Sequence, residues 1–159
     1  MFLVLHLLIL ISIFAILGIS LNLVVGETGL LSVTHAVFYG VGAYTTAILT
    51  KSFGWNFFLS IPAGILIALL IALLIGLVFS KFGGDYYALA TLGFNMIMFG
   101  VMLNWHELTN GPLGITGVAK PELFGFAFKE RATFLLLVVI FLSLTYWAAE
   151  WIKKSSFGR

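Results

Sequence analysis

The sequence contains no cysteine and little charge, and these two shortages already exclude several kinds of protein. Without Cys, the chain has no disulfide, no thiolate metal ligand and no catalytic thiol. Charged residues make up only 9% of the 159 positions and hydrophobic residues 62%, far from the balance of soluble domains. The 8 basic and 6 acidic residues are scattered, so we expect no nucleic acid partner.

Two sequence features that would suggest other functions are also missing. No G-x-x-x-x-G-K-[ST] phosphate loop occurs, so the chain does not bind ATP by that device. No Lys or Arg precedes Lys51, whereas a secretory signal begins with basic residues and has an apolar core of only ~7–15 residues. We therefore expect the first apolar run to stay in the mature protein.

Long apolar runs dominate the rest of the sequence. Free of charged residues, they cover 1–26, 28–50, 52–80, 86–106 and 132–149. A helix needs about 20 mostly apolar residues to cross the hydrocarbon core, and the runs lack the alternating pattern of barrel strands. The predicted fold class is therefore all-α, a polytopic membrane helical bundle of about five transmembrane or re-entrant helices. We expect residues 1–159 to form a single transmembrane domain.

The charged and turn-forming residues divide these runs into helices and connections. We expect helices over roughly 2–25, 30–50, 56–80, 86–105 and 132–152, joined by turns at 26–29 and 82–85 and by a long exposed loop over 106–131. Alternating crossings would place equal numbers of Lys and Arg on the two sides, so the positive-inside rule leaves the orientation open. Whether 30–50 crosses or re-enters also stays open.

Small residues recur along several of these segments. Helices in lipid associate through close backbone approach, which favours small side chains on one face. Between positions 64 and 80, a Gly, Ala or Ser occurs at every fourth residue. The glycines assigned to helix packing are Gly18, Gly26, Gly29, Gly40, Gly42, Gly64 and Gly76. We predict that Gly40→Leu disrupts assembly by blocking close approach.

Polar side chains inside the apolar runs have two interpretations. They form structural hydrogen bonds between helices, or they line a path for a solute. The pathway-lining candidates are Asn22, Ser32, Thr34, His35, Thr91 and Asn95. Asp85 follows two glycines and precedes an apolar run, so we expect it to cap a helix or to contact a cytoplasmic partner.

The histidines do not indicate a metal or haem centre. His6 lies 20 residues before Gly26 and His35 only 6 after Gly29, so the two would sit at different depths. No carboxylate or imidazole pair recurs at ligand spacing, and no nucleophile with a base and an orienting group is evident. We expect no metal site, no bound cofactor and no enzymatic activity.

Four stretches together resemble a known family. LNLVVGETGLLSVTHAVFYGVGAYTTAIL at 21–49 is similar to the signature of LivM-type permease subunits of branched-chain amino acid ABC importers. GDYYALATLGF at 84–94, TNGPLGITGV at 109–118 and SSFGR at 155–159 follow in the family's order. Together these stretches are spread over nearly the whole chain.

The resemblance implies a multi-pass permease component in the plasma (inner) membrane that forms part of a translocation pathway for branched-chain or related amino acids. Its implied partners are a second permease subunit, cytoplasmic ABC ATPase subunits that bind the ATP, a periplasmic or extracellular substrate-binding protein and membrane lipid. The 106–131 loop would face the binding protein. Family members are longer, with apolar segments before and after this stretch, so we expect that this chain alone does not perform ATP-driven uptake. The alternative is a truncated, transport-incompetent membrane scaffold or fragment.

Overall fold

The computed structural model describes residues 2–29, 32–118, 121–123, 126–127 and 130–154. They belong to two compact units, one formed by Met1–Leu30 with Phe128–Arg159 and the other by Leu31–Ala127. Each unit is described by itself below. The single domain expected over 1–159 stays a prediction.

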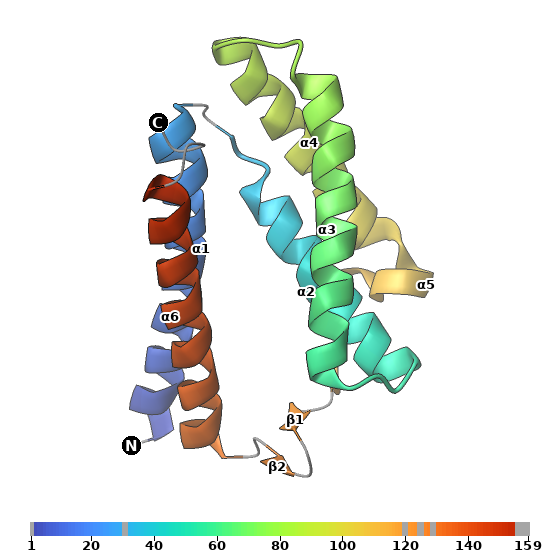
Figure 1. The fold of residues 1–159 in the computed structure, drawn as a ribbon. Coiled ribbons are helices and arrows are strands. Elements are labelled where there is room, and N and C mark those ends of the chain that lie inside the picture. The colour runs from blue at the N-terminus through green and yellow to red at the C-terminus, as the bar shows by residue number, and fades with distance from the viewer. Residues whose placement is uncertain (1, 30–31, 119–120, 124–125, 128–129, 155–159) are drawn as a thin grey trace. The chain divides into compact units, whose positions relative to one another are not determined.

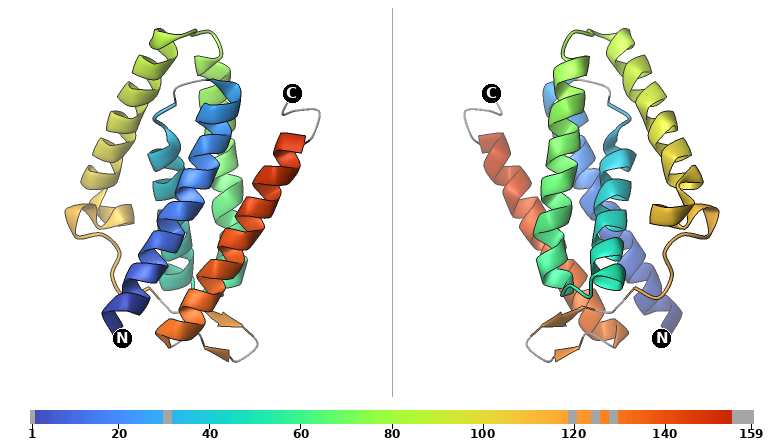
Figure 2. Two further views of the ribbon diagram at one scale, coloured as in Figure 1. Left: turned by 90° about the vertical axis from the view of Figure 1, so that its left-hand side faces the viewer. Right: turned by 90° about the vertical axis from the view of Figure 1, so that its right-hand side faces the viewer.

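The first unit is a pair of long helices. Helix α1 spans Phe2–Thr28 and helix α6 spans Arg131–Lys154, and they lie side by side and run in the same direction (Figures 1 and 2). The buried side chains of this unit are Ile9, Ser12, Leu137, Val138 and Ala149. Ser12 satisfies its hydroxyl within α1 by donating to the Leu8 carbonyl at 2.8 Å, as a polar side chain in an apolar environment must.

The second unit is built on three helices. Helix α2 spans His35–Ser52, helix α3 spans Phe57–Phe79 and helix α4 spans Asp85–Asn104. Helices α3 and α4 form an antiparallel hairpin, visible in green and yellow in Figure 2. The ring of Phe79 closes the hairpin by edge contacts with Tyr87 and Phe94, at centroid distances of 6.4 and 6.2 Å.

Short elements follow α4. Helix α5 spans His106–Thr109, the 3-10 helix η1 spans Gly111–Leu113, and strands β1 (Glu122–Leu123) and β2 (Phe126–Ala127) form a two-residue antiparallel ladder. The side chain of Asn56 ties this region to α3: its amide donates to the Glu122 carbonyl at 3.0 Å, and its oxygen accepts from the Phe58 N–H. Asn56 is thereby the N-cap of α3.

The outer surfaces of the helices are apolar. Along α3, Leu66, Leu69, Leu73, Leu74 and Leu77 are each more than half exposed, which acyl chains tolerate and water does not. Within the residues that the structure describes, four helices are long and apolar enough to cross a membrane: Leu3–Gly26, Phe57–Phe79, Asp85–Asn104 and Arg131–Lys154. The all-α membrane fold predicted from the sequence is confirmed, and the protein is a multi-pass membrane protein.

Two predicted helix boundaries and the expected form of one connection are wrong. The chain does not turn at Gly26, because α1 continues through Thr28 and ends at Gly29, whose φ of +66° suits glycine. Helix α2 begins at His35, five residues later than expected. The 106–131 region contains α5, η1 and the β1–β2 ladder where an irregular loop was expected.

Candidate functional site

A non-helical stretch, residues 32–34, precedes α2 and contacts α4. The backbone N–H of Val33 donates to the hydroxyl of Thr91 in α4 at 3.4 Å. Ser32 and Thr34 share a hydrogen bond between their hydroxyls at 2.8 Å. Thr34 is 4% exposed and Thr91 fully buried, so this contact is enclosed by protein.

Thr91, which this stretch contacts, lies within a candidate membrane span. Thr91 lies six residues beyond the start of α4, which corresponds to ~9 Å along the helix axis. Non-helical backbone at membrane depth is stable only where protein or water satisfies its polar groups. Here the Thr34 carbonyl accepts from Val37 at 2.9 Å and from Phe38 at 3.3 Å, while Thr91 serves the Val33 N–H. The hydroxyl of Thr91 therefore supplies the acceptor that the Val33 N–H lacks because α2 begins only at His35.

The structure brings together three of the six pathway candidates: Ser32, Thr34 and Thr91. His35 is adjacent, as the first residue of α2, and Asn95 lies one turn beyond Thr91 on α4, partly exposed. Asn22 is exposed on α1 in the first unit. Their role in lining a pathway stays a prediction.

The glycines assigned to packing differ in their surroundings. Gly64 is buried, and a Cβ there would lie 3.4 Å from both the Gly42 carbonyl and the Thr46 hydroxyl, so α2 and α3 approach closely at this point. A Cβ at Gly40 would lie 3.2 Å from the flexible end of Met102. Among the described residues, a Cβ at Gly18, Gly42 or Gly76 would meet no atom beyond its own helix within 4 Å.

The other two glycines of the set serve local geometry. At Gly26, a Cβ would lie 2.8 Å from the Asn22 side-chain oxygen, so the glycine leaves room for that amide on α1. Gly29 has a positive φ and ends α1, with its N–H donating to the Val25 carbonyl at 3.1 Å. These contacts lie within or at the end of one helix.

Asp85 is the first residue of α4, and Gly84 occupies the N-cap position with a φ of 55°. The N-cap is therefore Gly84, one residue before Asp85, which was expected in that position. The Asp85 carboxylate still lies in the first turn, where the helix dipole favours an anion. A contact between Asp85 and a cytoplasmic partner stays a prediction. In the part of the chain that the structure describes, no three His, Asp or Glu side chains gather as metal ligands would.

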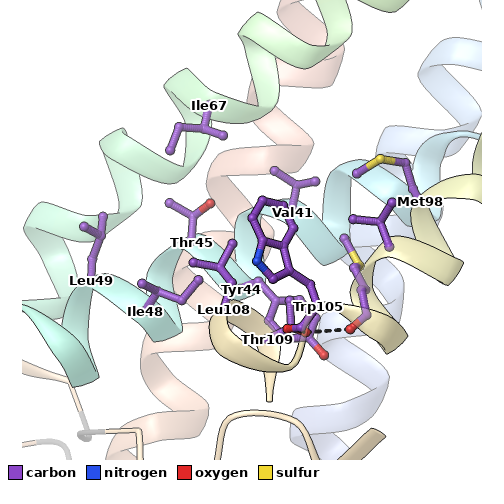
Figure 3. Close-up of a pocket in the computed structure, with 12 residues that line it drawn as sticks. Val41, Tyr44, Thr45, Ile48, Leu49, Ile67, Met98, Trp105, Leu108 and Thr109 are labelled. Carbon is purple, nitrogen blue, oxygen red and sulfur yellow. Dashed lines mark hydrogen bonds between the residues drawn. The ribbon is translucent and has the colours of Figure 1, made fainter. Parts of the chain in front are cut away.

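An apolar cavity of about 330 Å³ lies between α2, α3, α4 and α5 (Figure 3). This volume falls at the lower end of the range for small-molecule sites, ~300–1,000 Å³. Aliphatic, aromatic and thioether side chains form most of the wall. The lining residues are Val41, Tyr44, Thr45, Ile48, Leu49, Ile67, Met98, Val101, Met102, Trp105, Leu108 and Thr109.

Thr109 organises the end of this cavity. Its hydroxyl lies 2.6 Å from the Met102 carbonyl and 2.8 Å from the Trp105 carbonyl (Figure 3). The hydroxyl oxygen also accepts from the Gly111 N–H at 3.3 Å. The side chain is 4% exposed. It therefore joins the end of α4, α5 and the following turn, and fixes Trp105 and Leu108 at the cavity wall.

Glycine and asparagine are needed in the turn after Thr109. Asn110, Gly111, Gly114 and Gly117 all have positive φ, between 58° and 75°. The imidazole of His106 lies so close to Gly111 that a Cβ there would overlap it. This geometry explains the spacing of the TNGPLGITG sequence in terms of backbone conformation.

A second, polar pocket of about 200 Å³ adjoins the cavity. Ile48 and Leu108 line both spaces. The polar pocket also contains Lys51 from the last turn of α2 and Glu107 from α5. An apolar space therefore opens beside a place where one positive and one negative side chain are found.

The residues of the two pockets were not predicted from the sequence. Residues 106–131 were expected to form an exposed loop, so Glu107 and Thr109 were not considered as site residues, and Trp105 was expected only as the end of a helix. The available signal was an aromatic, a charged and a hydroxyl residue grouped at the end of an apolar run, followed by the closely spaced glycines.

Comparison with known proteins identifies the family. The family described as branched-chain amino acid transport system / permease component matches residues 3–159. The chain belongs to this family. The family resemblance inferred from the four sequence stretches is thereby confirmed.

Two relatives of this permease family member are closely similar over part of their length. The high-affinity branched-chain amino acid transport system permease protein LivM of Escherichia coli K12 is 42% identical over 120 residues, which are 76% of this chain and 28% of that protein. The LivM protein of Salmonella typhimurium LT2 is 42% identical over 118 residues, 74% of this chain and 28% of that protein. The chain thus matches less than a third of the length of either relative. No solved structure matches it.

Proposed function

We propose that the protein is a membrane permease component of an ATP-driven importer for branched-chain or related amino acids, and that it forms part of the translocation pathway. The observation that carries this proposal is the apolar, partly open cavity of about 330 Å³ between helices of a permease-family chain. Branched aliphatic side chains gain free energy by leaving water for such a space, roughly 0.8 kcal/mol per buried CH₂ group.

The non-helical stretch at 32–34 supports a transport role. Breaks in membrane helices allow the two parts of a segment to move separately, and alternating access requires such movements. The contact between Val33 and Thr91 is one long hydrogen bond of 3.4 Å, which is weak enough to be exchanged during a transport cycle.

The energy source and partners follow from the same proposal. The chain has no phosphate loop, so ATP is bound by separate cytoplasmic ATPase subunits, and this chain binds no cofactor and catalyses no reaction. A second permease subunit completes the membrane part. A substrate-binding protein delivers the amino acid to the side that carries 106–131, and the complex resides in the inner membrane.

Proteoliposomes test the proposal. The chain is reconstituted with the second permease, the ATPases and the binding protein of its host, and uptake of radiolabelled leucine is measured with ATP inside the vesicles. We expect leucine to accumulate above its external concentration only when ATP is present. Vesicles that lack this chain are the control, and equal accumulation in them would rule out a pathway role.

A further inference from the structure

The polar pocket and the apolar cavity adjoin in a way that matches the two chemical parts of a free amino acid. Lys51 and Glu107 line the polar pocket of about 200 Å³, and Ile48 and Leu108 separate it from the apolar cavity of about 330 Å³. A free amino acid carries a carboxylate, an ammonium group and one side chain on the same carbon atom. Both of its charges therefore lie within a few bonds of its apolar part.

Lys51 and Glu107 are available to a ligand. Both side chains are exposed, and in the described part of the chain neither forms an ion pair. Their polar neighbours are held by the protein: Asn110 donates to the Gly114 carbonyl at 3.0 Å, and the His106 ring packs on Gly111. Opposite charges that share a pocket without pairing have unused capacity for a zwitterion.

We propose that these two pockets form one recognition site for a zwitterionic amino acid with a branched aliphatic side chain. The Lys51 ammonium binds the ligand carboxylate, and the Glu107 carboxylate binds the ligand ammonium. The side chain passes between Ile48 and Leu108 into the cavity, where Trp105 contacts it. This inference rests on the proposed function for its ligand class, and it adds the residues that select the ligand.

The site lies at one end of the unit, where the proposed pathway would open. Lys51 lies in the last turn of α2, and Glu107 follows the end of α4, so both charges are at one end of the unit and outside the apolar spans. Charged groups are far less costly there than at the centre of a bilayer. The apolar cavity extends from this end along α2 and α4, as the lining residues Val41 and Met98 show.

The expected selectivity follows from the two pockets. Exposed ion pairs contribute little, so losing either charged contact is expected to weaken binding about two- to fivefold, and added salt is expected to reduce the effect. Alanine lacks three carbon atoms of leucine, which predicts binding about 50-fold weaker. The cavity thus determines affinity, and the charges select zwitterions over related monovalent ions.

Photolabelling tests the proposal on the full chain in lipid nanodiscs. The probe is photo-leucine, the diazirine analogue of leucine, and labelled peptides are identified by mass spectrometry. We expect labels within 41–49 and 98–109, suppressed by leucine and less well by leucinol, which lacks the carboxylate, or by 4-methylpentanoate, which lacks the ammonium group. Labels confined to other segments would overturn the proposal.

Charge variants give the sharper readout, because two competitors are compared within the same variant. Lys51→Gln is expected to abolish the preference for leucine over leucinol, and Glu107→Gln the preference for leucine over 4-methylpentanoate. Lys81→Gln, in the exposed turn between α3 and α4, removes a charge from the same unit and is expected to keep both preferences. Unchanged preferences in Lys51→Gln and Glu107→Gln would refute the assigned contacts.

A cavity-filling pair keeps the proposal testable if a charge variant fails to fold. Val101→Phe places an aromatic ring at the cavity wall in place of an isopropyl group and is expected to lower labelling at least tenfold, whereas Leu74→Phe on the exposed face of α3 is expected to leave it unchanged. Equal labelling of both variants would refute the site. An uptake measurement distinguishes this proposal from the proposed function. If the site is labelled but no ATP-driven uptake occurs, the transport function is rejected and the site is not. If uptake occurs and neither Lys51→Gln nor Glu107→Gln changes it, the site is rejected and the transport function is not.

Discussion

The close approach of α2 and α3 at Gly64 gives a prediction whose size follows from the structure. A Cβ at this position would lie 3.4 Å from the Gly42 carbonyl oxygen and from the Thr46 hydroxyl, and 3.8 Å from the Gly42 Cα. A methyl group makes ordinary contacts at these distances. A leucine side chain extends three further carbon atoms into space that α2 already occupies.

Two energetic terms determine the outcome at Gly64. Replacing a helical glycine by alanine or leucine favours the helix by ~0.8–1 kcal/mol. Overpacking by a large side chain costs about 1–3 kcal/mol. We therefore expect Gly64→Ala to be neutral or slightly stabilising and Gly64→Leu to be destabilising or, at best, neutral.

A second leucine variant isolates the steric term. Gly76 lies on the same helix with no atom beyond α3 within 4 Å among the described residues, so Gly76→Leu gains helix propensity without overpacking. The difference in free energy of unfolding between Gly64→Leu and Gly76→Leu should be about 1–3 kcal/mol, since the propensity term is shared. Titration with dodecyl sulfate in mixed micelles, followed by tryptophan fluorescence, measures it. Equal midpoints for the two variants would show that α2 and α3 are not in contact at Gly64.

Two further predictions concern the same unit. The natural chain has no cysteine, so a pair of introduced cysteines can be followed without interference. Thr46→Cys combined with Gly64→Cys should form a disulfide under mild oxidation, because the Thr46 hydroxyl lies 3.4 Å from a Cβ at position 64. Loss of maleimide labelling measures the disulfide. Thr46→Cys with Gly76→Cys, ~18 Å further along α3, should keep both thiols, and its crosslinking would disprove the α2–α3 register. Thr109→Val should lower the free energy of unfolding by ~1–3 kcal/mol because the Gly111 N–H loses its acceptor. Thr109→Ser retains the hydroxyl and should lower it less. Equal decreases in the free energy of unfolding, measured from the two denaturation curves, would contradict this role of Thr109.

The length of the charge-free apolar runs was sufficient to predict the long helices. The expected helix at 56–80 is observed as Phe57–Phe79 and the one at 86–105 as Asp85–Asn104, because a charged or glycine-rich turn limits each apolar run. The start of α2 was missed for a physical reason. Residues 30–34 are apolar enough for a helix, and the observed non-helical backbone at 32–34 depends on the hydroxyl of Thr91, 58 residues away from Val33 in the sequence.

The candidate site was harder to predict than the helices. Polarity within apolar runs pointed to Ser32, Thr34 and Thr91, which the fold does bring together. It could not point to the cavity, whose wall consists of ordinary aliphatic and aromatic side chains such as Val41 and Trp105. A cavity depends on how several helices are arranged, and residue type alone does not encode it.

The backbone geometry of residues 109–117 has a consequence for how this connection behaves. Four of its residues have positive φ values. The hydroxyl of Thr109 connects its first turn to the end of α4 through a hydrogen bond with the Met102 carbonyl. Loops usually accept replacements and insertions, but here most side chains would bring backbone strain. In a saturation mutagenesis screen this segment should tolerate as few substitutions as a buried helix. It therefore acts as a rigid connection between elements and not as a flexible linker.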